Sequence, residues 1–384
     1  MEEQVEMEER RPAEVFHPGE YLLDELNARG WTQTELADII SRPIRLVNEI
    51  INGRRGITPE TAREIGAALG TSAELWMNLD TAYQLWKAKE DVSPIVQRAK
   101  MRNMYPIRDM ASRGWILMSE DPQIVERQLL KFFEIGSLND QPKFAKLAIA
   151  KRSNSENEEI TPIQIAWLYR VKHIAQTMQV SQYSRDSLNR ALLQMMDFRK
   201  EPEEIKRIPQ LLEESGIRFV IVEPLPSSKI DGIAFWLDMN SPVIGLSLRY
   251  NRIDNFWFVL RHEIEHILEG YKDTVTIDLD LENTPLEKDD LPMEEKIANS
   301  AASEFCVQQA ELENFIANVA PFFSRKKVSA FAQEQGVHPG LVVGQLQRRL
   351  HRYDLFRSML VPIKDIISQV AITDGYGHII PIEL

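Results

Sequence analysis

Residues 32–55 read TQTELADIISRPIRLVNEIINGRR and contain two short helical patterns separated by one tight turn. Apolar side chains recur at helical spacing on both sides of the turn, namely Leu36, Ile39 and Ile40 before it and Leu46, Val47 and Ile50 after it. Pro43 and Gly53 mark where the second pattern begins and ends. Helices this short bury their apolar faces only by packing together, and two of them across one turn are typical of a helix-turn-helix unit.

The second of these patterns is basic, although the chain as a whole is acidic. The 384 residues carry a formal net charge of −13, whereas a single acidic residue, Glu49, stands among four arginines between positions 42 and 55. These arginines are Arg42, Arg45, Arg54 and Arg55. Guanidinium groups neutralise phosphates and form paired hydrogen bonds with guanine, so the segment predicts a DNA-binding surface. The alternative is an ordinary helical bundle with a solvated arginine cluster.

Helical patterns on both sides of this stretch extend the unit to residues 14–90. Thr58 and Pro59 are residue types that begin a helix, and Gly70 is the type that ends one. We therefore expect a five-helix domain here. Residues 1–13 carry a run of like charge and few apolar side chains, so we expect a mobile acidic tail before it.

The rest of the chain predicts a helical middle region and a C-terminal α+β domain. Residues 91–206 show helical patterns with apolar faces and no candidate chemistry. Residues 207–384 begin with short apolar runs bounded by turn residues, which predict a meander of strands in a small antiparallel sheet. The runs lie at 217–222, 233–237 and 243–248, and helical patterns follow at 254–268, 293–315 and 328–350. The predicted fold class is mainly α with an α+β C-terminal domain.

The sequence FWFVLRHEIEHIL, residues 256–268, places the motif His-Glu-x-x-His on an apolar helix. A spacing of four residues puts His262 and His266 on one helix face, where both imidazoles can bind one zinc ion while Glu263 polarises water. Catalytic zinc takes a third protein ligand, which we expect near the start of the next helix. The domain would then be zincin-like. The alternatives are two hydrogen-bonded histidines on a surface helix, or a purely structural zinc.

The N-terminal stretch resembles the HigA-type antitoxin repressors of the XRE helix-turn-helix class over roughly residues 14–89. The resemblance rests on HPGEYL at 17–22, NGRRGITPETA at 52–62 and LWMNL at 75–79. It implies that the helix beginning near Pro43 enters the major groove of an operator, usually from a dimer. It further implies that Arg45 and Asn48 contact bases and that Arg42, Arg54 and Arg55 contact phosphates or flanking bases. Residues 41–43, Ser-Arg-Pro, replace the Gly-Val-Ser frequent in relatives, so the start of that helix could be rotated or shortened.

The C-terminal stretch, over about residues 207–350, resembles the ImmA/IrrE family of metallopeptidase-like proteins. Here His-Glu-x-x-His is followed on a second helix by EEKIAN, residues 294–299. The resemblance implies that Glu295 completes the site with His262 and His266, with Zn²⁺ as the cofactor and Glu263 as the catalytic base. The sequence departs from the family pattern at Glu265, at Ala301 and at residues 305–308, so the cleft beyond the metal is expected to differ.

Several other polar or reactive side chains are expected to have structural rather than catalytic roles. We expect His338 to be a core or interdomain histidine rather than a fourth ligand, Tyr271 to pack rather than stabilise an oxyanion, and Cys306 to be a small core residue. Five aspartates lack the spacing of a calcium loop and are expected to solvate a connector. They are Asp273, Asp278, Asp280, Asp289 and Asp290.

Composition excludes several classes of protein. One cysteine excludes an intramolecular disulfide framework, and no apolar run approaches the roughly 18 residues that a membrane span needs. These two features predict a cytoplasmic protein with no membrane association. The two family resemblances imply a dimeric transcriptional regulator of the HigA antitoxin type, whose zinc-dependent domain senses or processes a partner. The partners that these resemblances imply are operator DNA and either a HigB-like toxin or a repressor protein that is its substrate. Two further hypotheses are a site-specific zinc metalloprotease that cleaves a repressor, and a DNA-binding antitoxin with a structural or inactive metal site.

Overall fold

The computed structural model describes residues 15–88, 93–144, 160–270, 276–279 and 291–381. Of residues 276–279 it describes the backbone alone. The chain divides into two compact units, Met1–Ser93 and Pro94–Leu384, and each is considered by itself. The predicted tail, residues 1–13, lies outside the described residues.

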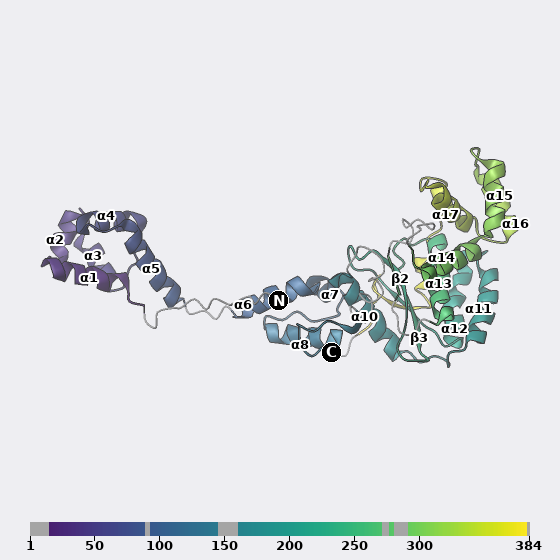
Figure 1. Cartoon of the computed structure of the whole chain (residues 1–384), viewed down its shortest axis with the longest axis horizontal. Coiled ribbons are helices and arrows are strands. Elements are labelled where there is room, and N and C mark those ends of the chain that lie inside the picture. Colours follow the sequence, from purple (N-terminus) through teal and green to yellow (C-terminus); the bar gives the residue numbers. More distant parts are fainter. Residues whose placement is uncertain (1–14, 89–92, 145–159, 271–275, 280–290, 382–384) are drawn as a thin grey trace. The chain divides into compact units, whose positions relative to one another are not determined.

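The first unit is a bundle of five short helices (Figure 1). They are α1 (Pro18–Arg29), α2 (Gln33–Ile39), α3 (Ile44–Ile51), α4 (Pro59–Leu69) and α5 (Ala73–Lys87). Their apolar faces meet in one core that includes Leu22, Leu36, Val47, Ile65 and Trp76. The predicted five-helix arrangement, with α2 and α3 across one turn, is confirmed.

Local sequence explains where these helices begin and end. Thr32 and Glu35 form a reciprocal capping box at the start of α2, and Thr58 caps α4 with Pro59 in its first turn. Gly70 ends α4 in the left-handed conformation, which glycine adopts without a steric penalty. Ser41 has a φ of 54° in the turn between α2 and α3.

The second unit contains the remaining helices and one sheet. The described α-helices are α6 (Ser93–Met104), α7 (Ile107–Ser112), α8 (Pro122–Phe133), α10 (Pro162–Thr177), α11 (Arg185–Phe198), α12 (Ile208–Glu214), α13 (Ile253–Glu269), α14 (Met293–Cys306), α15 (Gln309–Val319), α16 (Arg325–Gln335), α17 (Pro339–Leu350) and α18 (Lys364–Ile367). The 3₁₀ helices are η1 (Pro202–Arg207) and η2 (Arg357–Met359). The described strands are β1 (Arg218–Val222), β2 (Ile230–Trp236), β3 (Pro242–Leu246), β4 (Thr276–Leu279) and β5 (Ile372–Asp374).

The sheet is mixed, with strand order β4-β2-β3-β1-β5. Strand β1 is parallel to both β3 and β5, whereas β2 is antiparallel to β3 and β4. The prediction of a small antiparallel meander was therefore wrong. The physical reason lies in the near-continuous apolar runs of β1 and β3, because strands buried on both faces are typical of parallel pairing.

Helices cover both faces of this sheet (Figure 1). Phe219 and Ile244 point into a core shared with α11, α12 and α13. Val220 and Val243 point the other way, into a core shared with α8 and α10. The helical region 91–206 is therefore not a separate body, since its helix α10 packs on β1 and forms one outer layer of the same α/β unit.

A buried ion pair fastens the C-terminal strand to that outer layer. Arg170 of α10 donates from Nε and Nη2 to the two carboxylate oxygens of Asp374 on β5, at 2.8 Å each. Trp115 Nε1 and the backbone N–H of Ile380 also donate to this carboxylate.

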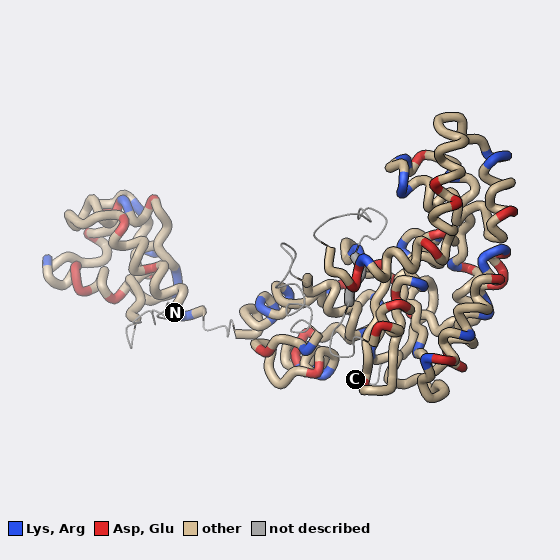
Figure 2. Tube along the Cα trace, turned by 45° about the vertical axis from the view of Figure 1, so that its right-hand side comes forward, with Lys and Arg blue, Asp and Glu red and all other residues tan. Residues whose placement is uncertain are grey.

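Elsewhere in the described residues, acidic and basic positions are interleaved along the helices (Figure 2).

Candidate nucleic-acid interface and metal centre

The outward face of α3 carries the most exposed of the predicted base-contacting side chains. The Arg45 side chain is 86% exposed, and its Nε donates to Glu49 Oε1 at 2.7 Å, one turn along the helix. Arg55 also pairs with Glu49, at 3.5 Å. These hydrogen bonds lower the pKa of the Glu49 carboxyl, with that from Arg45 the main cause. One partly buried carboxylate therefore pairs with two guanidinium groups beside α3.

Arg42 and Asn48 are held by neighbouring helices. Arg42 forms a two-pronged contact with Glu64 of α4, from Nε and Nη2 at 2.8–3.1 Å. Asn48 Nδ2 donates to Gln33 Oε1 at the start of α2, at 3.2 Å. Gln33 was missed by the sequence reasoning, and its place as the first residue of a helix facing α3 is visible only in the fold.

A close approach of two backbones sets where α3 sits on α1. A Cβ placed on Gly19 would lie 2.8 Å from Ile51 Cα and closer still to the carbonyl oxygen of Ile50. His17 precedes it and caps α1, because its Nδ1 accepts the Gly19 N–H at 2.9 Å. Burial lowers the pKa of His17, against opposing effects of Asp80 and Glu20. The His-Pro-Gly sequence thus supplies a cap and a contact point for α3.

The metal motif lies on α13, within the core of the second unit. His262 and Glu263 are 0% exposed and His266 is 3% exposed. Glu295, in the first turn of α14, reaches across to both histidines, with His262 Nε2–Oε2 at 3.3 Å and His266 Nε2–Oε1 at 3.7 Å. The two Nε2 atoms lie 2.9 Å apart. Burial opposes the charge on Glu295, but its hydrogen bonds with both histidines hold its pKa far below the usual range.

These three side chains fit a zinc ion. Bonds of 2.0–2.1 Å at tetrahedral angles place neighbouring ligand atoms about 3.3 Å apart. The observed separations of 2.9–3.7 Å lie on both sides of that value. Among the described residues, His262, His266 and Glu295 form the cluster of potential ligands that lie close enough together to hold a metal ion.

Glu263 projects from α13 toward the sheet. A Cβ placed on Gly232 of β2 would overlap Glu263 Oε1 and lie 2.7 Å from Val259 Cγ1. Only glycine at this strand position therefore leaves room for the carboxylate. Gly232 was missed by the sequence reasoning, although a glycine inside an apolar strand pattern is a known signal of close approach.

Glu265 is not part of the cluster of His262, His266 and Glu295. It pairs with Arg261 on the same helix at 2.6 Å, and both side chains are largely buried. Because the pair occupies a different stripe of α13 from His262 and His266, the extra carboxylate noted in the sequence is neutralised by its own helix.

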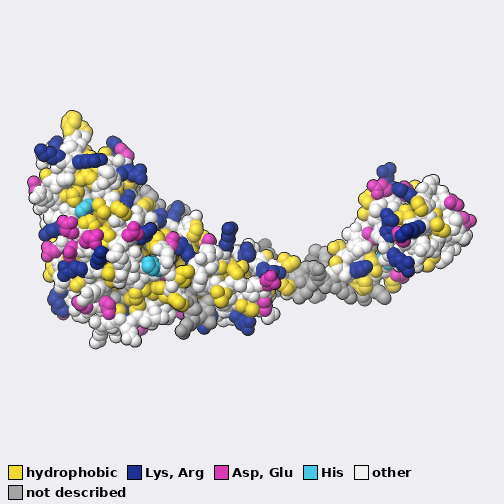
Figure 3. All heavy atoms as spheres, turned by 180° about the vertical axis from the view of Figure 1, so that it is seen from behind, with side chains coloured by type: hydrophobic (Ala, Val, Ile, Leu, Met, Phe, Trp, Pro, Cys, Tyr) yellow, Lys and Arg dark blue, Asp and Glu magenta, His cyan; other side chains and the backbone are white. Residues whose placement is uncertain are grey.

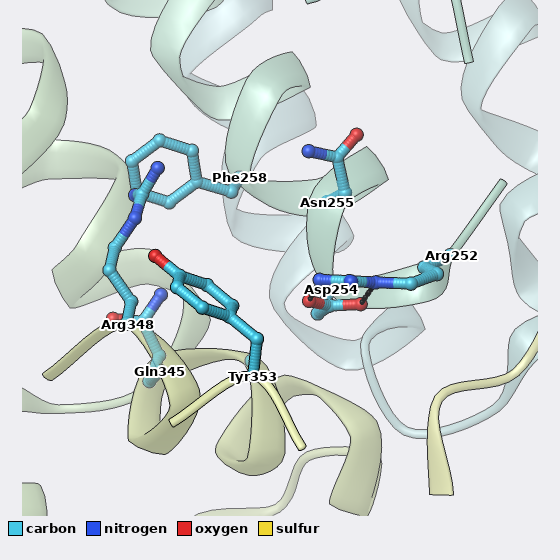
Figure 4. A pocket seen from close by; sticks show the side chains of 8 residues that line it. Arg252, Asp254, Asn255, Phe258, Gln345, Arg348 and Tyr353 are labelled. Carbon is cyan, nitrogen blue, oxygen red and sulfur yellow. Dashed lines mark hydrogen bonds and ion pairs between the residues drawn. The ribbon is translucent and has the colours of Figure 1, made fainter. Parts of the chain in front are cut away.

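A small polar pocket lies further along α13, toward its N-terminus (Figure 4). Arg252 forms a two-pronged ion pair with Asp254, and the Arg348 guanidinium of α17 lies 4.0 Å from the centre of the Phe258 ring. That ring is in turn 6.3 Å from the His262 ring. Phe258 thus lies against both Arg348 and the His262 ring.

The other singled-out residues take structural places. His338 caps α17 by accepting the Gly340 N–H at 3.0 Å and does not join the metal ligands. Cys306 lies in the apolar core, where burial raises its pKa to about 12. Tyr271 and the side chains of the five aspartates of the connector lie outside the described residues.

Comparison with known proteins identifies the first unit. A family model described as helix-turn-helix matches residues 22–76. Virulence-associated protein I of Dichelobacter nodosus is 38% identical over 82 residues, which are 21% of this chain and 76% of that protein. The chain belongs to the helix-turn-helix family.

Other relatives match the same helix-turn-helix domain. The uncharacterized HTH-type transcriptional regulator YddM of Escherichia coli is 28% identical over 82 residues, 21% of this chain and 81% of that protein. Among solved structures, the Pseudomonas aeruginosa antitoxin HigA with the higBA promoter is 37% identical and covers 20% of this chain and 83% of its own, with a TM-score of 0.19. A HigA-family addiction module antidote protein of Coxiella burnetii is 33% identical and covers 22% of this chain and 91% of its own, with a TM-score of 0.20.

The helix-turn-helix domain brings its predicted DNA-contacting residues together around α3. Arg45 and Asn48 lie on α3, with Arg54 and Arg55 just beyond its end and Arg42 in the turn before it. Arg54 is exposed and makes no ion pair among the described residues. Basic side chains gather on the face of this domain seen in Figure 3, with acidic ones among them.

No helix of the described residues is long and apolar enough to cross a membrane.

Proposed function

We propose that this protein is a transcriptional repressor of the HigA antitoxin type, which binds operator DNA as a homodimer through α3. The observation that carries the proposal is the place of Arg45, highly exposed at the start of the second helix of a helix-turn-helix pair. Membership of the family, and relatives that include a transcriptional regulator, support it.

The side chains around α3 divide between two tasks. The Arg45 fork matches the paired acceptors of guanine, and the Asn48 amide matches adenine, so these residues read bases. Arg42, Arg54 and Arg55 neutralise phosphates, which positions the domain and makes affinity depend on salt. Arg42 and Arg45 exchange their carboxylate partners, Glu64 and Glu49, for DNA when they bind.

Operator binding tests the base-reading assignment. The operator is first selected from random duplexes with the full chain, and affinity is then measured by fluorescence anisotropy. Arg45→Ala and Asn48→Ala should each lose about 1–3 kcal/mol on the selected site and discriminate less against altered sites. Arg63→Ala, on the exposed side of α4, is the matched control, and it should leave that discrimination unchanged. Unaltered specificity in both α3 variants would refute the groove assignment.

We further propose that the second unit binds Zn²⁺ through His262, His266 and Glu295 and uses this site to sense or process a protein partner, either a HigB-like toxin or a repressor. When bound there, zinc would act as a Lewis acid that polarises water or a substrate carbonyl. Glu263, which follows His262 and lies against Gly232, would accept a proton from water as a general base. Support comes from the convergence of three ligand atoms at zinc-like separations.

Metal analysis tests this site. Elemental analysis of the purified wild type should give one zinc per chain, and His262→Ala and Glu295→Ala should each lose it. Glu263→Gln is the matched control, since it removes the base and keeps every ligand. Zinc absent from a wild type prepared without chelators would refute the assignment.

The same Glu263→Gln protein separates the two remaining candidate functions. A site-specific metalloprotease that cleaves a repressor should lose cleavage while retaining zinc. A repressor with a structural zinc should show full operator binding and no change in any proteolytic assay, whereas its melting temperature should fall when the metal is removed.

A further inference from the structure

A second cavity of the second unit lies between α11, α13, α14 and α16. Its volume is about 470 Å³, which is within the range of small-molecule sites. Met196, Val307 and Val337 supply apolar walls, and Ala301 lines it with a minimal side chain. Its lining includes neither the metal ligands nor Glu263.

Arg199 supplies a buried positive charge at this cavity. The residue is 8% exposed, and its guanidinium lies 4.9 Å from the centre of the Phe305 ring. Nε donates to the Met196 carbonyl at 2.9 Å and Nη1 donates to the Phe305 carbonyl. Nη2 makes no hydrogen bond among the described residues.

No carboxylate neutralises this guanidinium in the described part of the chain. Asp197, the nearby acid, lies two residues before Arg199 and pairs instead with Lys200 at 3.5 Å. A buried charge without a counter-ion is costly, so an anion that enters the cavity gains a strong electrostatic partner.

Arg261 adds a second guanidinium to the lining. Its Nη2 pairs with Glu265, and its Nη1 is buried and makes no hydrogen bond among the described residues. Glu304 and Glu334 also line the cavity, but both are exposed and belong to its rim. Because Arg261 is paired with Glu265, Arg199 supplies the uncompensated positive charge of the cavity, and the acidic rim disfavours highly charged anions such as phosphates.

We propose that this cavity is a binding site for a small organic monocarboxylate, whose carboxylate pairs with Arg199 and whose apolar part lies against Phe305 and the aliphatic walls. A planar carboxylate matches the guanidinium fork, and a single negative charge meets less repulsion from the acidic rim than a phosphate does. The proposed site shares no residue with the predicted DNA-contacting or metal-binding sets.

Calorimetric titration of the full chain with benzoate tests this proposal. Benzoate should bind the wild type, while benzamide, which has the same shape without the charge, should bind at least about tenfold more weakly. Inorganic phosphate should also bind more weakly than benzoate. Equal binding of benzoate and benzamide, or no benzoate binding at about 10 mM, would overturn the proposal.

Three variants locate the site. Ala301→Phe fills the cavity and should abolish benzoate binding, and Arg199→Gln should weaken it at least about tenfold. Glu334→Gln, on the rim, should leave binding unchanged or tighten it. Circular dichroism checks that each variant is folded, and if Arg199→Gln fails to fold, Ala301→Phe still decides. Undiminished benzoate binding by folded Ala301→Phe would place the ligand elsewhere and refute the assignment.

Discussion

At the scale of single residues, both proposed sites of the second unit depend on positions with a very small side chain or none. Gly232 belongs to β2 and contributes no functional group, yet the Glu263 carboxylate occupies the space of its missing Cβ. Ala301 likewise leaves open part of the cavity beside Arg199. Small residues are therefore part of how these two sites are built.

Gly232→Ala should destabilise the second unit by about 1–3 kcal/mol, because the new methyl group overlaps Glu263 and Val259 in a packed core. Urea unfolding followed by tryptophan fluorescence measures this. The matched control is Gly136→Ala, an exposed position where the nearest atom to the new Cβ lies 3.4 Å away. If the two variants lost equal stability, the close approach of Glu263 to β2 would be wrong.

At the scale of elements, α1 and α3 illustrate how one helix fixes another. Gly19→Ala should push α1 from α3, because the new Cβ would lie against the backbone of Ile50 and Ile51. We expect a lower melting temperature of the helix-turn-helix domain and weaker operator binding. Thermal unfolding and anisotropy measure these effects. Gly56→Ala is the control, because the atoms nearest to its new Cβ belong to the Asp80 side chain, at 3.1–3.5 Å, and not to the backbone of another helix.

The cap of α1 should respond to pH. Its Nδ1 acceptor requires a neutral His17, and burial lowers the pKa of His17 in the folded state below the ordinary value of 6.5. The stabilisation is therefore complete above about pH 6.5 and is lost as the pH falls through the folded-state pKa. NMR titration of the His17 ring checks the direction.

His17→Asn provides the comparison for this pH effect. Asparagine can also cap a helix but does not titrate, so the variant should show a smaller loss of helix-turn-helix stability between pH 7.5 and pH 5.5. A His17 pKa at or above 6.5 in the folded chain would contradict the proposed role of burial.

At the scale of the whole molecule, the second unit is held together by contacts between segments far apart in the sequence. In the second unit, the buried pair of Arg170 and Asp374 ties α10 to β5 across more than 200 residues of sequence. Arg170→Met should cost about 3–5 kcal/mol, because it leaves the Asp374 carboxylate buried without its counter-ion. Chemical denaturation measures the loss.

An exposed ion pair is the control for this prediction. Lys206→Met breaks the pair with Glu203 in η1 and should change stability by less than about 1 kcal/mol. Equal effects of the two substitutions would mean that the Arg170 pair does not hold the layers together.

The sequence by itself determined what depends on neighbouring residues. The helix-turn-helix arrangement, the cap at Thr58, the end of α4 at Gly70 and the shared face of His262 and His266 all follow from spacings within a few turns. The placing of Glu295 beside those histidines was expected from family resemblance, and the structure brings the three together, although their role as ligands stays a prediction.

Only the tertiary structure decided what depends on distant pairing. The parallel pairing of β1 with β3 and β5 and the cover of the sheet by α10 join segments that no local pattern connects. The same holds for Glu263 against Gly232 and for the cavity beside Arg199. An apolar run shows that a strand is buried, but neither its partner nor its direction, because both are set by long-range hydrogen bonds and packing.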